Sequence, residues 1–142
     1  MKKRWDVLAD GPERGQQGAA MLEFVLTAGL LFLLLFGILD VGLALNARLT
    51  VAAAAREGAR RAAIEGGETA AVLERVRAQL TLGRIDASQA DISVSPRQAS
   101  LGSSITVTVD YPYTFTSPMI QSLARGPIHL HAEAVSRSER VR

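Results

Sequence analysis

The sequence predicts an α+β fold, in which a long N-terminal helix crosses a membrane and continues into a small head with a second helix and a three-stranded antiparallel sheet. Three observations predict it. Residues 24–39 contain no charged side chain, helix-forming composition continues to the Gly66-Gly67 pair, and apolar residues alternate with polar ones in three segments after residue 90.

The apolar run defines the membrane-spanning part of the first helix. Together with residues 19–23 it reaches about 21 residues, roughly 31 Å as a helix, which is about one hydrocarbon thickness. The next segment, VGLALNARLTVAAAAREGARRAAIE, is rich in Ala, Leu and Arg and has no proline. We therefore expect one helix over residues 19–65 that spans the membrane to about residue 40.

Basic residues before the apolar run predict its orientation. Lys2, Lys3, Arg4 and Arg14 would keep the N-terminus in the cytoplasm, although Arg48 and the arginines after it weaken the asymmetry. Residues 1–18 are polar and glycine-containing, which predicts a cytoplasmic leader peptide. A secretory signal peptide would have a small-residue cleavage site after its apolar region, and no such site follows here.

Residues 66–142 are predicted to form the exported head, which ends in a frayed basic tail. A helix is expected over residues 68–82, with its apolar residues on one face and Gly83 as its end. Strands are expected over residues 91–95, 104–115 and 128–136. The residues expected to face inward are Val72, Val76, Leu80, Ile92, Val94, Ile105, Val107, Val109, Tyr111, Ile128, Leu130, Ala132 and Ala134.

A stripe of apolar, mostly small side chains is predicted on the long helix beyond the membrane. It consists of Leu45, Leu49, Ala52, Ala55, Ala59 and Ala62. Small residues let another backbone come close, so the stripe should pack on the head, and the membrane-proximal residues should meet neighbouring subunits. The candidate helix-packing residues are Gly37, Gly42, Ala52, Ala55 and Ala59. On the polar side, Glu57 is expected to pair with Arg61.

Composition argues against several classes of function. The net charge of +2 and the scattered basic residues do not indicate a nucleic-acid binder, and the chain has no cysteine for a disulfide or a thiolate metal site. His129 and His131 share a strand face, which we interpret as a solvated polar face because no third ligand is in view. Ser103, Ser104, Ser117 and Ser136 lack a nucleophile elbow. We expect no enzyme activity, no cofactor and no small-molecule substrate.

A carboxylate, Glu23, stands at the entrance of the apolar run. An acid in a bilayer is costly and usually has a partner or a task. A cut after Gly18 would create an α-amino group on Ala19 about one helical turn from Glu23, or within reach of Glu23 in a staggered neighbour. The alternative is that Glu23 is hydrated in the headgroup zone. Asp40, at the other end of the run, is interpreted as a membrane-boundary residue in preference to a contact with another subunit.

Gly18, a four-residue gap and Glu23 together resemble the type IV prepilin processing site. The segment GAAMLEFVLTAGLLFLLLFGILDVGLALNARLTVAAAAREGARRAA also resembles the N-terminal region of TadE-like proteins, pilin-like subunits of tight-adherence (Flp-type) pilus systems. The residues that carry it are Glu23-Phe24, the step from Phe36 to Gly42, and the AREGAR segment over residues 55–60. Gly29 stands where that family commonly has proline.

The resemblance implies a pseudopilin of the bacterial inner membrane, with its head exported, that is cut by a prepilin peptidase. The implied processing residues are Gly18, Ala19, Glu23 and Phe24. Its implied partners are the peptidase, other pilin-like subunits, pilus assembly platform proteins and membrane lipid. The alternative from the residues alone is an uncleaved, signal-anchored envelope protein whose small head binds a ligand or a partner.

Overall fold

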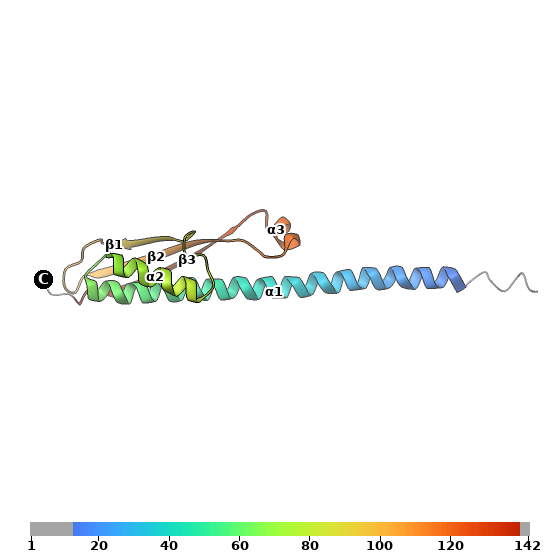
Figure 1. Ribbon diagram of the computed structural model, residues 1–142, viewed down its shortest axis with the longest axis horizontal. Helices are drawn as coiled ribbons and strands as arrows, with labels where there is room; N and C mark the ends of the chain where they lie inside the picture. Colours follow the sequence, from blue (N-terminus) through green and yellow to red (C-terminus); the bar gives the residue numbers. More distant parts are fainter. Residues whose placement is uncertain (1–12, 140–142) are drawn as a thin grey trace, which may run out of the picture. The chain divides into compact units, whose positions relative to one another are not determined.

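A computed structural model describes residues 13–139 of the chain. Most of the predicted leader, with Lys2, Lys3 and Arg4, and the last residues of the predicted tail lie outside this range. The elements are α1 (Glu13–Glu65), α2 (Ala70–Leu82), β1 (Asp91–Ser95), β2 (Ser104–Tyr113), α3 (Pro118–Ala124) and β3 (Ile128–Arg137), shown in Figure 1. This composition of one long helix, shorter helices and a three-stranded antiparallel sheet confirms the predicted α+β fold.

The chain forms two compact units, residues 1–38 and residues 39–142. The first unit, described from Glu13, is a stretch of α1 whose apolar side chains are almost all exposed. By length and composition, α1 could cross a membrane. Helix α1 begins earlier than the predicted residue 19. Gln16 and Gln17 are good helix formers, and an isolated glycine such as Gly18 costs a helix only about 1 kcal/mol.

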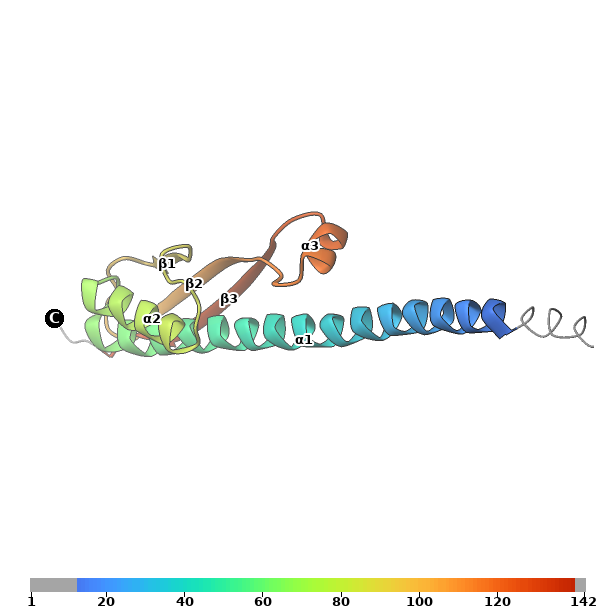
Figure 2. The same cartoon turned by 45° about the vertical axis from the view of Figure 1, so that its right-hand side comes forward.

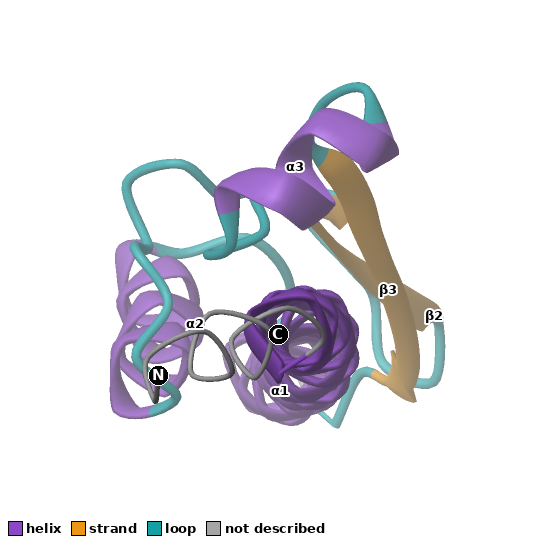
Figure 3. Cartoon of the chain, turned by 90° about the vertical axis from the view of Figure 1, so that its right-hand side faces the viewer, coloured by secondary structure: helices purple, strands orange, loops and turns teal. Residues whose placement is uncertain are grey.

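The head is built on the sheet, whose strand order is β1-β2-β3. Both pairings are antiparallel: Asp91 lies opposite Asp110 in the first, and Ser104 lies opposite Arg137 in the second. The part of α1 beyond residue 40 lies between α2 and the strands β2 and β3, as the view along the helix in Figure 3 shows. The core is therefore a seam where one helix is covered from two sides.

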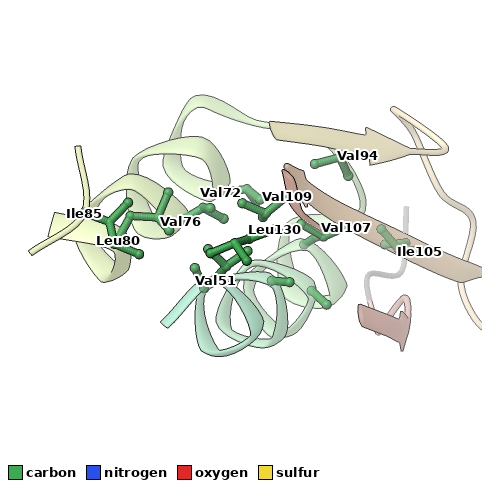
Figure 4. Close-up of a cluster of buried hydrophobic side chains, with 14 of the residues drawn as sticks. Val51, Val72, Val76, Leu80, Ile85, Val94, Ile105, Val107, Val109 and Leu130 are labelled. Carbon is green, nitrogen blue, oxygen red and sulfur yellow. The ribbon is translucent and has the colours of Figure 1, made fainter. Parts of the chain in front are cut away.

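The core combines alanines and Val51 from α1 with larger aliphatic side chains that come mainly from α2 and the sheet (Figure 4). Val72, Val76 and Leu80 form the buried face of α2, as the sequence predicts. Val107 and Val109 come from the inner face of β2 and are fully buried. Fully burying a side chain of this size contributes about 1.5–3 kcal/mol, so these few residues account for much of the stability of a small head.

The predicted apolar stripe on α1 is wrong in its membrane-proximal half. Leu45 is 56% exposed and Leu49 is 59% exposed, whereas Ala47 and Val51 are buried in their place. Periodicity alone does not distinguish the predicted stripe from the one that is buried, because small apolar residues surround α1 in this region. Towards the C-terminal end of α1 the predicted and the buried stripe share residues. The residues buried there are Ala54, Ala55, Ala59, Ala62 and Ala63.

Helix α3 is the element that the sequence prediction missed. No helix was predicted between the strands expected over residues 104–115 and 128–136, but Pro118 stands at the start of α3 with Ser117 as its N-cap residue. Proline is common at this position because its missing N–H has no partner in a helix anyway. Figure 2 shows α3 in the connection between β2 and β3.

The N-terminus of α2 offers a test of local stability. Thr69 Oγ1 accepts a hydrogen bond from the Val72 amide at 3.3 Å, in the geometry of a helix N-cap. We expect Thr69→Ala to lower the free energy of unfolding of the head by about 1 kcal/mol, because this amide loses the side-chain oxygen and keeps only the Thr69 carbonyl as an acceptor. Thr69→Ser keeps the oxygen and is the matched control. Equal losses in denaturant unfolding of the two variants would contradict the capping role.

Candidate functional site

The predicted processing residues lie on the exposed surface of α1 in the first unit. Gly18 and Ala19 are helical, and Glu23 and Phe24 follow on the same helix with their side chains open to the surroundings. The Phe24 side chain makes no part of a core. The segment is therefore accessible to a partner along its whole length, although its backbone is hydrogen-bonded as a helix.

The glycines of α1 fall into two groups by what surrounds them. Among the described residues, nothing lies within 4 Å of a Cβ atom added at Gly18, Gly29, Gly37 or Gly42. A Cβ atom added at Gly58 would collide with Val76 Cγ2 and lie 3.1 Å from Val107 Cγ1. Packing among the described residues therefore explains Gly58 and gives no such reason for Gly18, Gly29, Gly37 and Gly42.

Gly58 lies at the centre of the AREGAR segment, where α1 contacts both α2 and β2. The predicted packing residues Ala55 and Ala59 are buried on either side of it, and Ala52 is half-buried. At Gly37 and Gly42, the other predicted packing residues, an added Cβ atom would have no neighbour within 4 Å in the part of the chain that the structure describes. Sequence reasoning assigned the seam to alanines and did not single out Gly58.

Glu57 and Arg61 pair differently from the prediction. Arg75 Nε donates to Glu57 Oε1 at 2.8 Å and so links α2 to α1. Arg61 pairs with Glu65 at 2.7 Å, one turn further along, and not with Glu57. Spacing within a single helix could not predict a partner of Glu57 on α2. Exposed pairs of this kind contribute about 0–1 kcal/mol each.

Asp40 is a buried acid, with only 3% of its surface exposed. Its Oδ2 atom accepts a hydrogen bond from the Ser117 amide at 3.0 Å, so it holds the start of α3 against α1. Both interpretations from the sequence, a boundary residue or a contact with another subunit, missed this partner within the chain. A contact between residues so far apart in sequence leaves no signal in local patterns.

Aromatic side chains lie at the end of β2 and in the residues just after it. Tyr113 and Phe115 pack edge to face, with ring centroids 5.6 Å apart. Burial raises the pKa of Tyr113, and the Asp40 carboxyl and Tyr111 raise it further. Tyr111, Tyr113 and Leu43 line a cleft of 220 Å³ beside Asn46.

The remaining candidates for chemistry lie apart from these residues. His131 Nδ1 is 2.8 Å from Asp110 Oδ1 on the exposed face of the sheet. Within residues 13–139, no group of three potential metal ligands comes together. In the turn after α2, hydrogen bonds from the side chains of Ser88 and Gln89 hold the pKa of the Asp86 carboxyl below its ordinary value. This carboxyl shapes the turn.

Comparison with protein families decides what the long helix is similar to. Residues 18–60 match the family model described as TadE-like protein. The predicted resemblance is therefore confirmed over this TadE-like segment, which is just under a third of the chain. The match connects the chain with tight-adherence pilus systems, to which the resemblance points. Neither the curated proteins nor the solved structures contain a match.

The TadE-like segment has informative limits. It begins at Gly18, the residue before the predicted cut, and ends at Arg60, at the end of the AREGAR segment. It thus contains Glu23, Asp40 and Gly58 but no part of α2 or the sheet. The family pattern covers the apolar helix and most of the surface of α1 on which the head packs.

Proposed function

We propose that this chain is a pilin-like (pseudopilin) structural subunit of a tight-adherence, Flp-type pilus system, and not an enzyme. A prepilin peptidase cuts the precursor between Gly18 and Ala19. The mature subunit then takes part in pilus assembly, and through it in surface adhesion and secretion. The observation that carries the proposal is a family match that starts at Gly18, with Glu23 five residues later on an exposed apolar helix.

The surroundings of the glycines support a role for α1 outside the chain. Gly37 and Gly42 have open space around them, so they serve close helix approach only if another molecule supplies the second helix. The part of α1 that belongs to the head continues with exposed apolar residues at four-residue steps, Val41, Leu45 and Leu49. Other pilin-like subunits and assembly platform proteins would pack on these residues.

The proposed topology follows from the same helix. α1 crosses the bacterial inner membrane once, the leader lies in the cytoplasm, and the head is exported. The membrane holds the subunit until it enters an assembly. In this setting the peptidase meets Gly18 near the cytoplasmic surface of the bilayer.

Gly18 also has a physical reason to be a cleavage point. A protease needs an extended backbone, whereas residues 13–24 are helical in the structure. Glycine lowers the cost of local unwinding by about 1 kcal/mol relative to alanine, because it stabilises a helix least of the residues other than proline. It also leaves room beside the scissile bond.

Substituting Gly18 tests the proposal. We expect Gly18→Leu to abolish processing, because a bulky, helix-favouring residue would fill the space beside the bond and resist unwinding. Gly29→Leu is the matched control, since an added Cβ atom there also has no neighbour within 4 Å among the described residues, and it should be cut normally. Intact-mass measurement of the membrane-extracted proteins, from cells with and without the peptidase, shows whether residues 1–18 have been removed.

The same measurement separates the proposal from its rival. An uncleaved, signal-anchored envelope protein would keep residues 1–18 whether or not an active peptidase is present. Its head would offer a ligand the open groove of 630 Å³ between α1 and α2, whose lining includes Glu57, Arg61 and Arg75. Those side chains already pair with other residues of the chain. A retained leader in cells with active peptidase would reject the pseudopilin proposal.

A further inference from the structure

Helix α3 exposes apolar side chains without burying any residue of its own. Met119 is 57% exposed and Leu123 is 79% exposed, and their spacing of four residues puts them on one side of the helix. The polar residues Gln121 and Ser122 lie between them in the sequence. A helix with this arrangement has an apolar surface that nothing in the described part of its own chain covers.

A helix of this length is not stable by itself in water. It has 7 residues, fewer than isolated helices need, and most helical stability in proteins comes from packing of an apolar face. The contact that positions it is the hydrogen bond from the Ser117 amide to Asp40. An external apolar phase would provide the missing stabilisation.

The position of Asp40 in the sequence indicates where α3 would meet a membrane. It is the first charged residue after the uncharged run of residues 24–39. A hydrocarbon core about 30 Å thick takes up about 20 residues of helix, so a span that starts near residue 20 ends close to Asp40. The amide of Ser117 bonds to this residue, and α3 therefore begins at the outer edge of the span.

Two features of composition fit a lipid surface at this level. The only aromatic residues after Phe36 are Tyr111, Tyr113 and Phe115, and all three lie directly before α3. Aromatic residues, tyrosine and tryptophan above all, are enriched where a membrane meets water. The segment from residue 114 to residue 127 carries one charged side chain, Arg125, and no acid, so nothing in it repels phospholipid headgroups.

We propose that α3 lies on the outer surface of the bilayer that α1 crosses, with Met119 and Leu123 inserted between the headgroups and the acyl chains. Tyr113 and Phe115 lie at headgroup level, and Arg125 faces the lipid phosphates. Asp40 acts as the tether that holds this contact at the correct height. The inference goes beyond pilus assembly and rests only on the membrane-spanning part of the proposed function.

The absence of cysteine from the chain permits a direct test. Leu123→Cys is labelled with an environment-sensitive fluorophore in the full-length protein, which is reconstituted into phosphatidylglycerol–phosphatidylethanolamine vesicles. Leu101→Cys is the matched control, because Leu101 is also an exposed leucine, 59% accessible, but stands before β2 and thus about 30 Å away along the strand. Lipids with a nitroxide near the headgroup supply the quencher.

We expect several-fold stronger quenching at position 123 than at position 101, and a loss of that difference when Asp40→Ala releases the tether. Equal quenching at the two positions would overturn the proposal. Protection from a water-soluble quencher that disappears when the protein is diluted in lipid would also overturn it, because a second copy would then be the occupant. Carbonate extraction of the same vesicles reports separately on membrane insertion. A chain that is extracted contradicts the spanning helix itself.

Discussion

Gly58→Val is expected to destabilise the head by about 3 kcal/mol, with a fall in Tm of about 10–20 °C. A Cβ at this position would collide with Val76 Cγ2 and crowd Val107 Cγ1, so the substitution forces apart the helix pair and the sheet at once. The neighbouring Ala55 and Ala59 are buried and leave α1 little room to shift. A small domain with only about 5–15 kcal/mol of stability loses a large part of it.

Unfolding in detergent, followed by circular dichroism in denaturant, measures this effect. Gly42→Val is the matched control, because an added Cβ atom there has no neighbour within 4 Å among the described residues. A finer test combines Gly58→Ala with Val76→Ala. If the collision is real, the double variant should lose less stability than the sum of the two single variants. Additive losses, or a stable Gly58→Val head, would contradict the close contact.

Helix α2 and the three strands of the head were predictable because each has its own period of apolar residues. Apolar residues recur at helical spacing in α2, and Val107 and Val109 alternate with threonines in β2. Gly67 also marked the end of the long helix. Its φ of +134° is rare for residues with a side chain, and an added Cβ would collide with the Arg97 carbonyl group.

What could not be predicted depends on contacts between distant segments. The choice between Leu45 and Ala47 as the buried face of α1 is decided by where α2 and β2 lie, and the sequence of α1 does not contain that information. Helix α3 depends on Asp40, far back in the chain. The candidate site divides in the same way. Gly18 and Glu23 were found from their spacing, whereas the packing role of Gly58 required the structure.

Substitution of Glu23, the acid at the entrance of the apolar helix, is expected to have the second large effect, on association between subunits. Glu23 is exposed on α1, and none of the ion pairs found among residues 13–139 involves it. On the proposed function, cleavage supplies the partner, because the new α-amino group of Ala19 reaches Glu23 of a neighbouring subunit. In hydrocarbon an isolated charge is costly and pairing is strong, so removing one partner of a buried pair costs about 3–5 kcal/mol.

We therefore expect Glu23→Gln to weaken self-association of the mature subunit in vesicles by about 100-fold or more, which corresponds to about 3 kcal/mol. Energy transfer between labelled copies, measured while the protein is diluted in lipid, gives the association constant. Glu57→Gln is the control. It also removes a carboxylate, but its partner Arg75 is an exposed side chain of the same head, so association should be unchanged.

The decisive experiment combines the Glu23→Gln substitution with the presence or absence of cleavage. Four species are measured: the cut chain and the uncut chain, each with either glutamate or glutamine at position 23. If the amine of Ala19 is the partner, the glutamate strengthens association only in the cut chain, because the uncut chain has no free amine there. A similar effect of Glu23→Gln in both forms would mean that the acid acts without the new N-terminus, as a residue hydrated among the headgroups or bound elsewhere.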